Sequence, residues 1–298
     1  MSELGFDGRV VVVTGAGGGL GRSHALEFAR RGALVVVNDV GGSVNGQGQG
    51  ETPAQQVVGE IAALGGEAVA NFDSVATPEG GRAIVQSALD AFGRIDVVVN
   101  NAGILRDKAF HNMDSEMIDA VLDVHLKGAL FVSQPAFRAM REQGFGRIVN
   151  TTSASGLFGN FGQANYGAAK AGLAGLTRVL ALEGARFNIR VNAIAPVART
   201  RMTEGILGDL AARLDPESVT PVVVYLGHEE CAVTGQIYSV AGGRVARVFF
   251  AESPGVVLAE LTPEAVRDHL DGIEAAEGFF VPESLDDETT IIGKALSQ

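Results

Sequence analysis

Short runs of β-branched residues recur along the 298-residue chain and alternate with longer amphipathic segments. This alternation predicts βαβ units, in which crossover helices join parallel strands. Most runs are apolar at nearly every position, which is typical of strands covered by helices on both faces. We therefore expect a doubly wound α/β domain built on a seven-stranded parallel sheet. The expected strands are Val10–Val13, Leu34–Val37, Ala68–Phe72, Ile95–Val99, Arg147–Thr151, Ile189–Ile194 and Gln236–Val240.

Segments of helical length fill the intervals between these strands. They are Gly21–Arg31, Pro53–Leu64, Pro78–Phe92, Ser115–Gln143, Gln163–Phe187 and Pro216–His228. No linker rich in Pro, Gly and Ser divides the series, so residues 1–243 are predicted to form one domain. The tail, residues 244–298, contains one expected helix, Thr262–Ala276, which Thr262 and Pro263 open in N-cap and N1 order. We expect this C-terminal helical extension to pack on the domain or on a second subunit.

Composition narrows the possible classes of function. The net charge of −12 argues against a binder of duplex nucleic acid, because such binding depends on neutralising phosphates. Cys231 is the only cysteine, which excludes an intramolecular disulfide and a cysteine-rich metal site and suits a reducing compartment. No apolar stretch approaches the roughly 18 residues of a membrane span, and the first residues do not resemble a signal peptide. We expect a cytoplasmic protein that needs neither a membrane nor a metal.

The first strand runs directly into the glycine-rich turn of residues 14–21, where the first helix opens. Glycines let the backbone turn tightly and approach a pyrophosphate, whose charge the free N–H groups of a helix N-terminus can meet. A glycine cluster alone could be a plain tight turn, but the order of strand, turn and helix favours a dinucleotide site. We expect Gly15, Gly19, Leu20 and Gly21 to lie against the cofactor.

The ends of the next strands carry further candidate contacts. Asp39 stands 18 residues after Gly21, where a carboxylate would accept hydrogen bonds from the adenosine ribose and repel a 2′-phosphate. This predicts NAD rather than NADP; the alternative is a solvated turn aspartate. Asp73 is the candidate for the adenine amino group, and the carboxyl edge of the sheet is where open α/β folds bind ligands. The expected contacts at these strand ends are Asp73, Ser74, Val75, Asn101, Ala102 and Gly103.

A second group of residues suggests catalysis. Tyr166 and Lys170 are four residues apart, so on the helix from Gln163 their side chains share one face. The ammonium and a positive nicotinamide ring would lower the pKa of the tyrosine from about 10 and make it a better base. The alternative is a surface pair on an amphipathic helix. Ser153, 13 residues before Tyr166, follows the fifth strand. Its alternative role is turn capping, which suits Ser155 better than Ser153.

Together these motifs resemble the short-chain dehydrogenase/reductase family. The chain carries Thr-Gly-x-x-x-Gly-x-Gly, Asn-Asn-Ala-Gly, then Ser and Tyr-x-x-x-Lys, in the family's order and spacing over residues 8–243. The resemblance implies a Rossmann fold and a nicotinamide-dependent oxidoreductase. It implies that Tyr166 is the general acid and base on the substrate oxygen and that Ser153 holds that oxygen. Lys170 would bind the nicotinamide ribose and lower the pKa of the tyrosine.

Two positions depart from the family's pattern. His125 stands where the family usually has an asparagine, whose backbone carbonyl holds a water in a proton relay, so a histidine need not abolish activity. We keep His125 among the catalytic candidates. Pro196 is followed by Val197 where the family often has glycine, in the loop expected to contact the nicotinamide carboxamide.

A narrower resemblance extends over almost the whole chain, to the (3R)-hydroxyacyl-CoA dehydrogenase units of peroxisomal multifunctional enzyme type 2. The segments that carry it are Val37–Gly42, Ala70–Val75, Ala102–Asp107, Gly156–Tyr166 and the tail from Thr262. It implies an NAD-dependent homodimer, or a higher homo-oligomer, that oxidises (3R)-3-hydroxyacyl-CoA thioesters with fatty acyl or steroid side chains. The last residues, Lys294–Gln298, are not a peroxisomal signal, so we expect a free-standing cytoplasmic enzyme.

Several basic residues could bind the CoA phosphates, or could be scattered solvated charges. They are Arg106, Lys108, Arg199 and Arg201. Other functions stay open: a 17β-hydroxysteroid dehydrogenase, a 3-oxoacyl-[acyl carrier protein] reductase, or a dinucleotide-sensing protein without catalysis. Asp39 opposes the reductase, because such reductases generally prefer NADPH. The intact set of Ser153, Tyr166 and Lys170 argues against the sensing protein.

Overall fold

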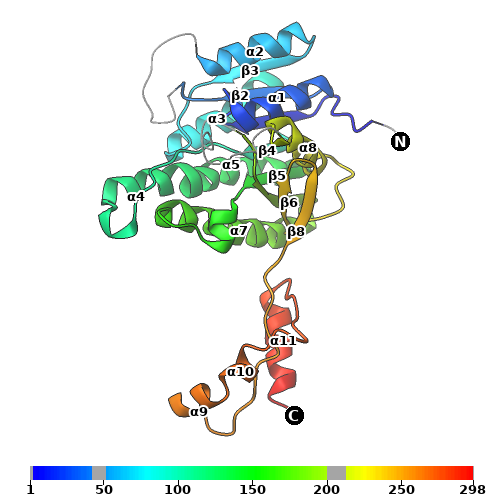
Figure 1. Cartoon of the computed structure of the whole chain (residues 1–298). Coiled ribbons are helices and arrows are strands. Elements are labelled where there is room, and N and C mark those ends of the chain that lie inside the picture. Colours follow the sequence, from blue (N-terminus) through cyan, green and yellow to red (C-terminus); the bar gives the residue numbers. More distant parts are fainter. Residues whose placement is uncertain (1–2, 42–51, 200–212, 298) are drawn as a thin grey trace. The chain divides into compact units, whose positions relative to one another are not determined.

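The computed structural model describes residues 3–41, 52–199 and 213–297 (Figure 1). The chain divides into two compact units, Met1–Arg247 and Val248–Gln298. The first unit holds a sheet with helices on both faces. Two residues of the sequence analysis lie outside the described ranges: Arg201, and Gly42 at the end of the segment Val37–Gly42.

The sheet has the strand order β3-β2-β1-β4-β5-β6-β7-β8. Its strands are β1 Val10–Thr14, β2 Leu34–Asn38, β3 Glu67–Asn71, β4 Val97–Asn100, β5 Gly146–Thr151, β6 Ile189–Pro196, β7 Ile237–Ala241 and β8 Arg244–Val248. All pairings among the first seven strands are parallel, which confirms the doubly wound architecture.

The eighth strand was not predicted. It pairs with β7 after a two-residue connection, Gly242 and Gly243, whose φ angles of 52° and 86° favour glycine. Its alternating sequence, Arg-Val-Ala-Arg-Val, lies in what we expected to be the tail. The predicted domain boundary at residue 243 therefore falls inside this hairpin.

The helices of the first unit match the expected intervals with local differences. They are α1 Gly19–Arg30, α2 Pro53–Ala63, α3 Pro78–Phe92, α4 Ser115–Leu122, α5 Gly128–Gln143, α6 Ala154–Phe158, α7 Ala164–Gly184 and α8 Thr220–Gly227. The expected helix over residues 115–143 is interrupted by a π-helical turn, Asp123–Lys127. The short helix α6 was not predicted, and a 3-10 turn, Ala185–Phe187, extends α7.

Two hydrophobic clusters lie on opposite faces of the sheet, which explains why its strands are apolar throughout. Val11 and Val13 of β1 belong to the cluster that contains Phe28 of α1. Val10 and Val12 belong to the other cluster, with residues of α3 and α5. All four valines are fully buried, and burying such a side chain contributes about 1.5–3 kcal/mol.

The order of the strands reverses between β1 and β4. From β1 the chain winds outward to β2 and β3, and then returns to place β4 on the other side of β1. At such a switch point the loops after the two strands diverge and leave a crevice at the carboxyl edge. Thr14, Asn100 and Thr151 end the strands β1, β4 and β5 at this edge. The sheet thus brings the glycine turn and the catalytic candidates to one place.

The second unit contains α9 Pro263–Asp268, α10 Leu270–Ile273 and α11 Leu285–Ala295. Thr262 caps α9 as predicted, its hydroxyl accepting a hydrogen bond from the Ala265 N–H at 3.0 Å. The single helix expected over residues 262–276 is broken at His269, which has the non-helical φ of −113°. The helix α11 was not predicted, although a capping box from Ser284 to Asp287 marks its start.

Candidate active site

The glycines of the turn are required because neighbouring backbone atoms leave no room for a side chain. Gly15 has a φ of +62°, and a Cβ there would lie 2.8 Å from the Ala102 Cα. A Cβ on Gly21 would lie 2.3 Å from the Gly15 carbonyl oxygen. Gly18, the N-cap of α1, supplies no side-chain hydrogen bond to the first helical N–H groups. The turn therefore offers backbone N–H groups to an anion, as a pyrophosphate site requires. Leu20 packs against the hydrophobic core beside this turn.

Asp39 lies directly over the glycine turn. One carboxylate oxygen accepts a hydrogen bond from the Gly17 N–H at 3.0 Å, and the other accepts one from the Gly41 N–H at 2.9 Å. A Cβ on Gly17 would lie 2.8 Å from this carboxylate, so only glycine fits. Each oxygen keeps a lone pair for a ribose hydroxyl. A phosphate at the same place would meet the negative charge of Asp39.

An amide network fixes the ends of β2 and β3. The Asn38 side-chain amide donates to the Asn71 side-chain oxygen at 2.8 Å and to the Asp73 carbonyl at 2.9 Å. Asn71 in turn donates to the Asp73 carboxylate at 2.8 Å. Asp73 is thus held at the sheet edge, with Ser74 exposed beside it. Val75 is buried and lines a cavity next to His125, so it lies deeper than the expected adenine contact.

Thr14 joins the glycine turn to the segment that follows β4. Its hydroxyl accepts hydrogen bonds from the Asn101 N–H at 3.0 Å and the Ala102 N–H at 3.1 Å. The Asn101 side chain donates to the carbonyls of Thr14 and Gly15. Thr14 was not among the predicted site residues. The sequence feature that could have revealed it is a hydroxyl-bearing residue directly after four consecutive valines.

Ser153, Tyr166 and Lys170 come together at the carboxyl edge of β5. Ser153 is the N-cap of α6 and accepts a hydrogen bond from the Ser155 N–H at 3.2 Å. The capping role expected of Ser155 therefore belongs to Ser153. Its side chain also forms a hydrogen bond with Tyr166. Lys170 is buried, donates to the Thr151 carbonyl at 2.5 Å, and has its Nζ 5.5 Å from the centroid of the Tyr166 ring.

The start of α7 is held by Asn165, which the sequence analysis missed. Its buried amide donates to the Arg106 carbonyl at 3.1 Å and to the Met117 carbonyl at 3.0 Å. Its side-chain oxygen accepts from the Tyr166 N–H at 2.8 Å. Asn165 thereby fixes Tyr166 relative to α4 and the loop after β4. An amide directly before the tyrosine of Tyr-x-x-x-Lys is the signal that could have revealed it.

The electrostatics of Tyr166 differ from the expectation. Burial raises the pKa of Tyr166, the hydrogen bond with Ser153 lowers this pKa, and Asp107 raises it again. Burial also lowers the pKa of Lys170 to about 7. Lys170 was expected to lower the pKa of Tyr166. In the structure the largest effect on this pKa is desolvation of the hydroxyl, so the pKa rises.

His125 occupies the π-helical turn and lies edge-on against Tyr166, with ring centroids 5.1 Å apart and an interplanar angle of 89°. Its Nε2 is 2.8 Å from the Ile104 carbonyl oxygen. A Cβ on Gly103 would lie 2.3 Å from the imidazole Cε1, so this glycine makes room for the ring. Burial and the nearby Lys170 lower the pKa of His125 well below 6.5, which makes the ring neutral at pH 7.

Other expected residues lie around this edge. Pro196 ends β6, and the Val197 N–H donates to the Val240 carbonyl at 2.9 Å. Lys108 is exposed, and its N–H donates to the Gly162 carbonyl at 2.9 Å. Arg199 forms an ion pair with Asp215 at 2.5 Å, so this guanidinium is already partnered.

A family profile described as short chain dehydrogenase matches residues 9–209. The match covers the glycine turn, Ser153, Tyr166 and Lys170. The chain belongs to the short-chain dehydrogenase family. It is therefore an oxidoreductase, and proteins of this kind use NAD or NADP as the hydride carrier.

Three proteins illustrate the sequence similarity of this dehydrogenase to its relatives. Over 293 residues it is 50% identical to peroxisomal multifunctional enzyme type 2 of Mus musculus, covering 97% of this chain and 40% of that enzyme. It is 58% identical to a short-chain type dehydrogenase/reductase of Mycobacterium tuberculosis, covering 82% of this chain and 86% of the relative. A hydroxyacyl-CoA dehydrogenase of the same bacterium is 39% identical over 92% of both chains. The chain thus spans well under half of the mouse enzyme.

Solved structures agree with this relationship. Full-length peroxisomal multifunctional enzyme type 2 from Drosophila melanogaster matches with a TM-score of 0.85 and 39% identity, covering 99% of this chain and 50% of that one. A short chain dehydrogenase from Mycobacterium avium matches with a TM-score of 0.81 and 46% identity, covering 91% and 97% of the two chains. No helix of this dehydrogenase within the described ranges is long and apolar enough to cross a bilayer.

Proposed function

We propose that this dehydrogenase oxidises (3R)-3-hydroxyacyl-CoA thioesters, with fatty acyl or steroid side chains, to 3-oxoacyl-CoA with NAD as the hydride acceptor. The observation that carries the proposal is the extent of the similarity to the mouse multifunctional enzyme. At 50% identity it runs over 97% of the chain, and so includes the tail beyond the dehydrogenase fold. The similarity to a hydroxyacyl-CoA dehydrogenase over 92% of both chains supports the same substrate class.

The position of Asp39 supports NAD. Its carboxylate lies over the glycine turn and accepts hydrogen bonds from Gly17 and Gly41. A ribose hydroxyl can donate to this carboxylate, whereas a 2′-phosphate would be repelled by it. The same argument weighs against the acyl-carrier-protein reductase, which belongs to a group that generally prefers NADPH.

The chemistry requires removal of one proton and one hydride from the substrate. Tyr166, in its ionised form, would take the proton from the 3-hydroxyl oxygen, while Ser153 holds that oxygen in place. Bound NAD would accept the hydride from C3, so that the C–H and O–H bonds break as the C=O bond forms. Lys170 lies beside the tyrosine ring and supplies the positive charge that favours ionisation. The proton on Tyr166 then returns to solvent.

The substrate class is tested by comparing kcat/KM with NAD for four compounds. These are a medium-chain (3R)-hydroxyacyl-CoA, the corresponding free acid, a hydroxylated steroid side-chain CoA thioester and a free 17β-hydroxysteroid. We expect the thioesters to be the better substrates. If the free steroid is preferred by more than about tenfold, the acyl-CoA assignment is wrong and only the dehydrogenase class survives.

A further inference from the structure

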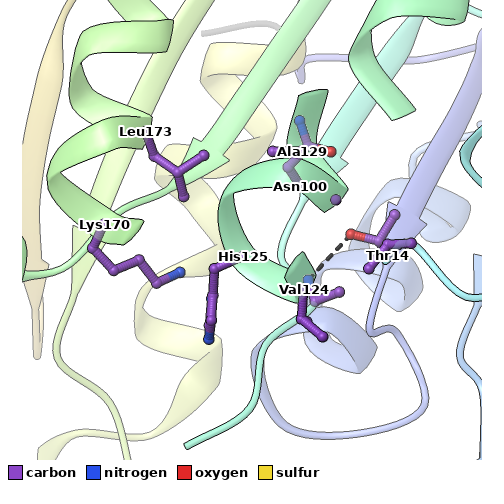
Figure 2. A pocket seen from close by; sticks show the side chains of 10 residues that line it. Thr14, Asn100, Val124, His125, Ala129, Lys170 and Leu173 are labelled. Atoms are coloured by element: carbon purple, nitrogen blue, oxygen red, sulfur yellow. Dashed lines mark hydrogen bonds between the residues drawn. The ribbon is translucent and has the colours of Figure 1, made fainter. Parts of the chain in front are cut away.

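A small cavity is lined in part by His125 and Lys170 (Figure 2). Its volume of about 10 Å³ is room for one water molecule. Polar walls come from Thr14, Asn100, His125 and Lys170, and apolar walls from Val75, Val124 and Leu173. Figure 2 shows the Lys170 ammonium pointing toward the His125 ring. A buried water needs such polar partners.

The ring of His125 is held on three sides. Tyr166 lies edge-on to it, Gly103 packs against Cε1, and Nε2 contacts the backbone of Ile104. The residue is 3% exposed. Its Nδ1 is buried and has no hydrogen-bond partner among the residues that the structure describes. An unpaired buried nitrogen of this kind costs about 1–3 kcal/mol unless a water satisfies it.

The contacts of Nε2 indicate which ring nitrogen carries the hydrogen. The Ile104 carbonyl oxygen at 2.8 Å can only accept, so it requires an Nε2–H donor. The Ile104 N–H is farther away, at 3.1 Å, and would require the opposite tautomer. That tautomer would also place a hydrogen on the unpartnered Nδ1, in a ring close enough to Lys170 for its charge to lower the imidazole pKa. The Nε2–H tautomer instead leaves Nδ1 with a lone pair that can accept a hydrogen bond, and is therefore favoured.

Lys170 has a corresponding need. The ammonium has three N–H donors and is 3% exposed. Within the described ranges its Nζ donates to the Thr151 carbonyl at 2.5 Å. With so little solvation, burial brings the pKa of Lys170 down to about 7. A further acceptor near the ammonium would favour its charged form.

We propose that His125 is a positioning residue whose Nδ1 accepts a hydrogen bond from a single water in this cavity, and that this water also accepts one from the Lys170 ammonium. The imidazole thereby keeps Lys170 charged beside Tyr166. This role belongs to the side chain and is separate from any role of the backbone carbonyl at this position. It rests on the proposed roles of Tyr166 and Lys170 in catalysis.

No other charged group described near His125 replaces this acceptor. On its own π-helical turn, Asp123 pairs with Lys127 at 2.7 Å. From α7, the ring faces Tyr166 and Lys170. From the loop after β4, Asp107 acts on Tyr166. Of the charged groups named here, Lys170 is the one that acts on the pKa of His125.

The test is an NMR titration of Lys170, labelled at Cε, in the full protein without substrate or cofactor. In the variant H125F an aromatic ring remains but the nitrogen acceptor is lost, so the titration midpoint should fall by about one pH unit. In H125Q, which keeps an acceptor oxygen, the midpoint should fall by less than half of that amount. Equal midpoints in the wild-type protein and H125F, or equal shifts in the two variants, would overturn the proposal.

A second measurement needs no variant and no activity. Long-range ¹H–¹⁵N spectra of the wild-type protein should show His125 as the neutral Nε2–H tautomer between pH 6 and 9. Detection of the Nδ1–H tautomer would overturn the proposal even if H125F does not fold. Because both measurements are made without turnover, they are independent of the substrate assignment. A failure of the acyl-CoA assay would leave them unchanged.

Discussion

At the residue scale, the chemistry depends on opposing effects at Tyr166. Burial raises the pKa of its hydroxyl, and the hydrogen bond with Ser153 lowers that pKa. Lys170 contributes to the balance only while it is charged, and its pKa of about 7 places that charge near the point of loss. Sequence analysis could bring these side chains together, but it could not predict the cost of their burial. That cost depends on the packing around them.

The first prediction concerns the acid–base role. Replacing Tyr166 by Phe removes the group that takes the proton but keeps the ring against His125. We expect turnover to fall by at least about 100-fold, with the dissociation constant for NAD nearly unchanged. Stopped-flow or steady-state assays and a fluorescence titration of the cofactor would measure the two quantities. Near-normal turnover in Tyr166→Phe would remove this residue from the proposed role.

A second prediction at this scale concerns the cofactor. Asp39→Ala deletes both the ribose acceptor and the repulsion of a 2′-phosphate. The affinity for NAD should therefore fall more than the affinity for NADP. Asp39→Asn separates the two effects, because the amide oxygen can still accept a hydrogen bond while the charge is gone. If the ratio of the two dissociation constants is the same in all three proteins, Asp39 is only a turn residue.

At the scale of elements, close approach between helices explains why α3 contains glycine. A Cβ on Gly81 would lie 2.4 Å from the Phe131 carbonyl oxygen of α5, a backbone atom that cannot move aside alone. Gly59 of α2 has nothing within 4 Å of its Cβ position. The two glycines therefore allow a controlled comparison of Gly→Ala substitutions in helices, with Gly81 in a tight contact and Gly59 in open space.

We expect Gly81→Ala to destabilise the protein by about 1–3 kcal/mol, because α3 must move away from α5. Gly59→Ala should stabilise it by about 0.5–1 kcal/mol, since alanine is the better helix former. Urea unfolding at one fixed protein concentration would measure both changes. Equal effects of the two substitutions would contradict this account of the helix packing.

The elements that were predicted correctly are those with a strong periodic pattern. The seven apolar runs became strands because burial on both faces demands such runs. The elements that were missed depend on tertiary context. The strand β8 alternates and lies beyond a glycine pair, α6 has only five residues, and the π-helical turn is a local insertion within a continuous helical pattern. At the site, Thr14 and Asn165 were missed because their roles are contacts between distant segments.

At the scale of the whole molecule, the outer face of α7 suggests how copies of the protein associate. Four small residues of α7 would permit close packing against another helix: Ala168, Ala169, Gly172 and Gly175. Two of these face inward: Ala169 is fully buried, and a Cβ on Gly172 would lie 2.9 Å from the side chain of Leu126. The exposed face of α7 is nevertheless apolar and includes small side chains. Its exposed residues are Ala164, Ala168, Ala171, Gly175, Val179 and Leu182, followed by the charged Glu183 near the C-terminal end of the helix.

We expect the protein to be at least a two-fold dimer at micromolar concentration, with this face of α7 in the interface. Val179→Asp should yield a monomer, because the carboxylate would be buried without a partner. Leu64→Asp is the control, since Leu64 is 58% exposed at the end of α2, away from α7. Light scattering would show the masses. A monomeric wild-type protein would refute the prediction.

The central claim is that this site transfers a hydride from a (3R)-3-hydroxyacyl-CoA to NAD. In this proposal Ser153 and Tyr166 would fix the substrate oxygen and the cofactor would fix the path of the hydride, so only one enantiomer would present its hydrogen correctly. The most direct measurement is the appearance of NADH absorbance with resolved (3R) and (3S) isomers of one medium-chain thioester. We expect kcat/KM for the (3R) isomer to exceed that for the (3S) isomer by at least about 100-fold. Equal rates for the two isomers, or reduction of NADP in preference to NAD, would contradict the claim.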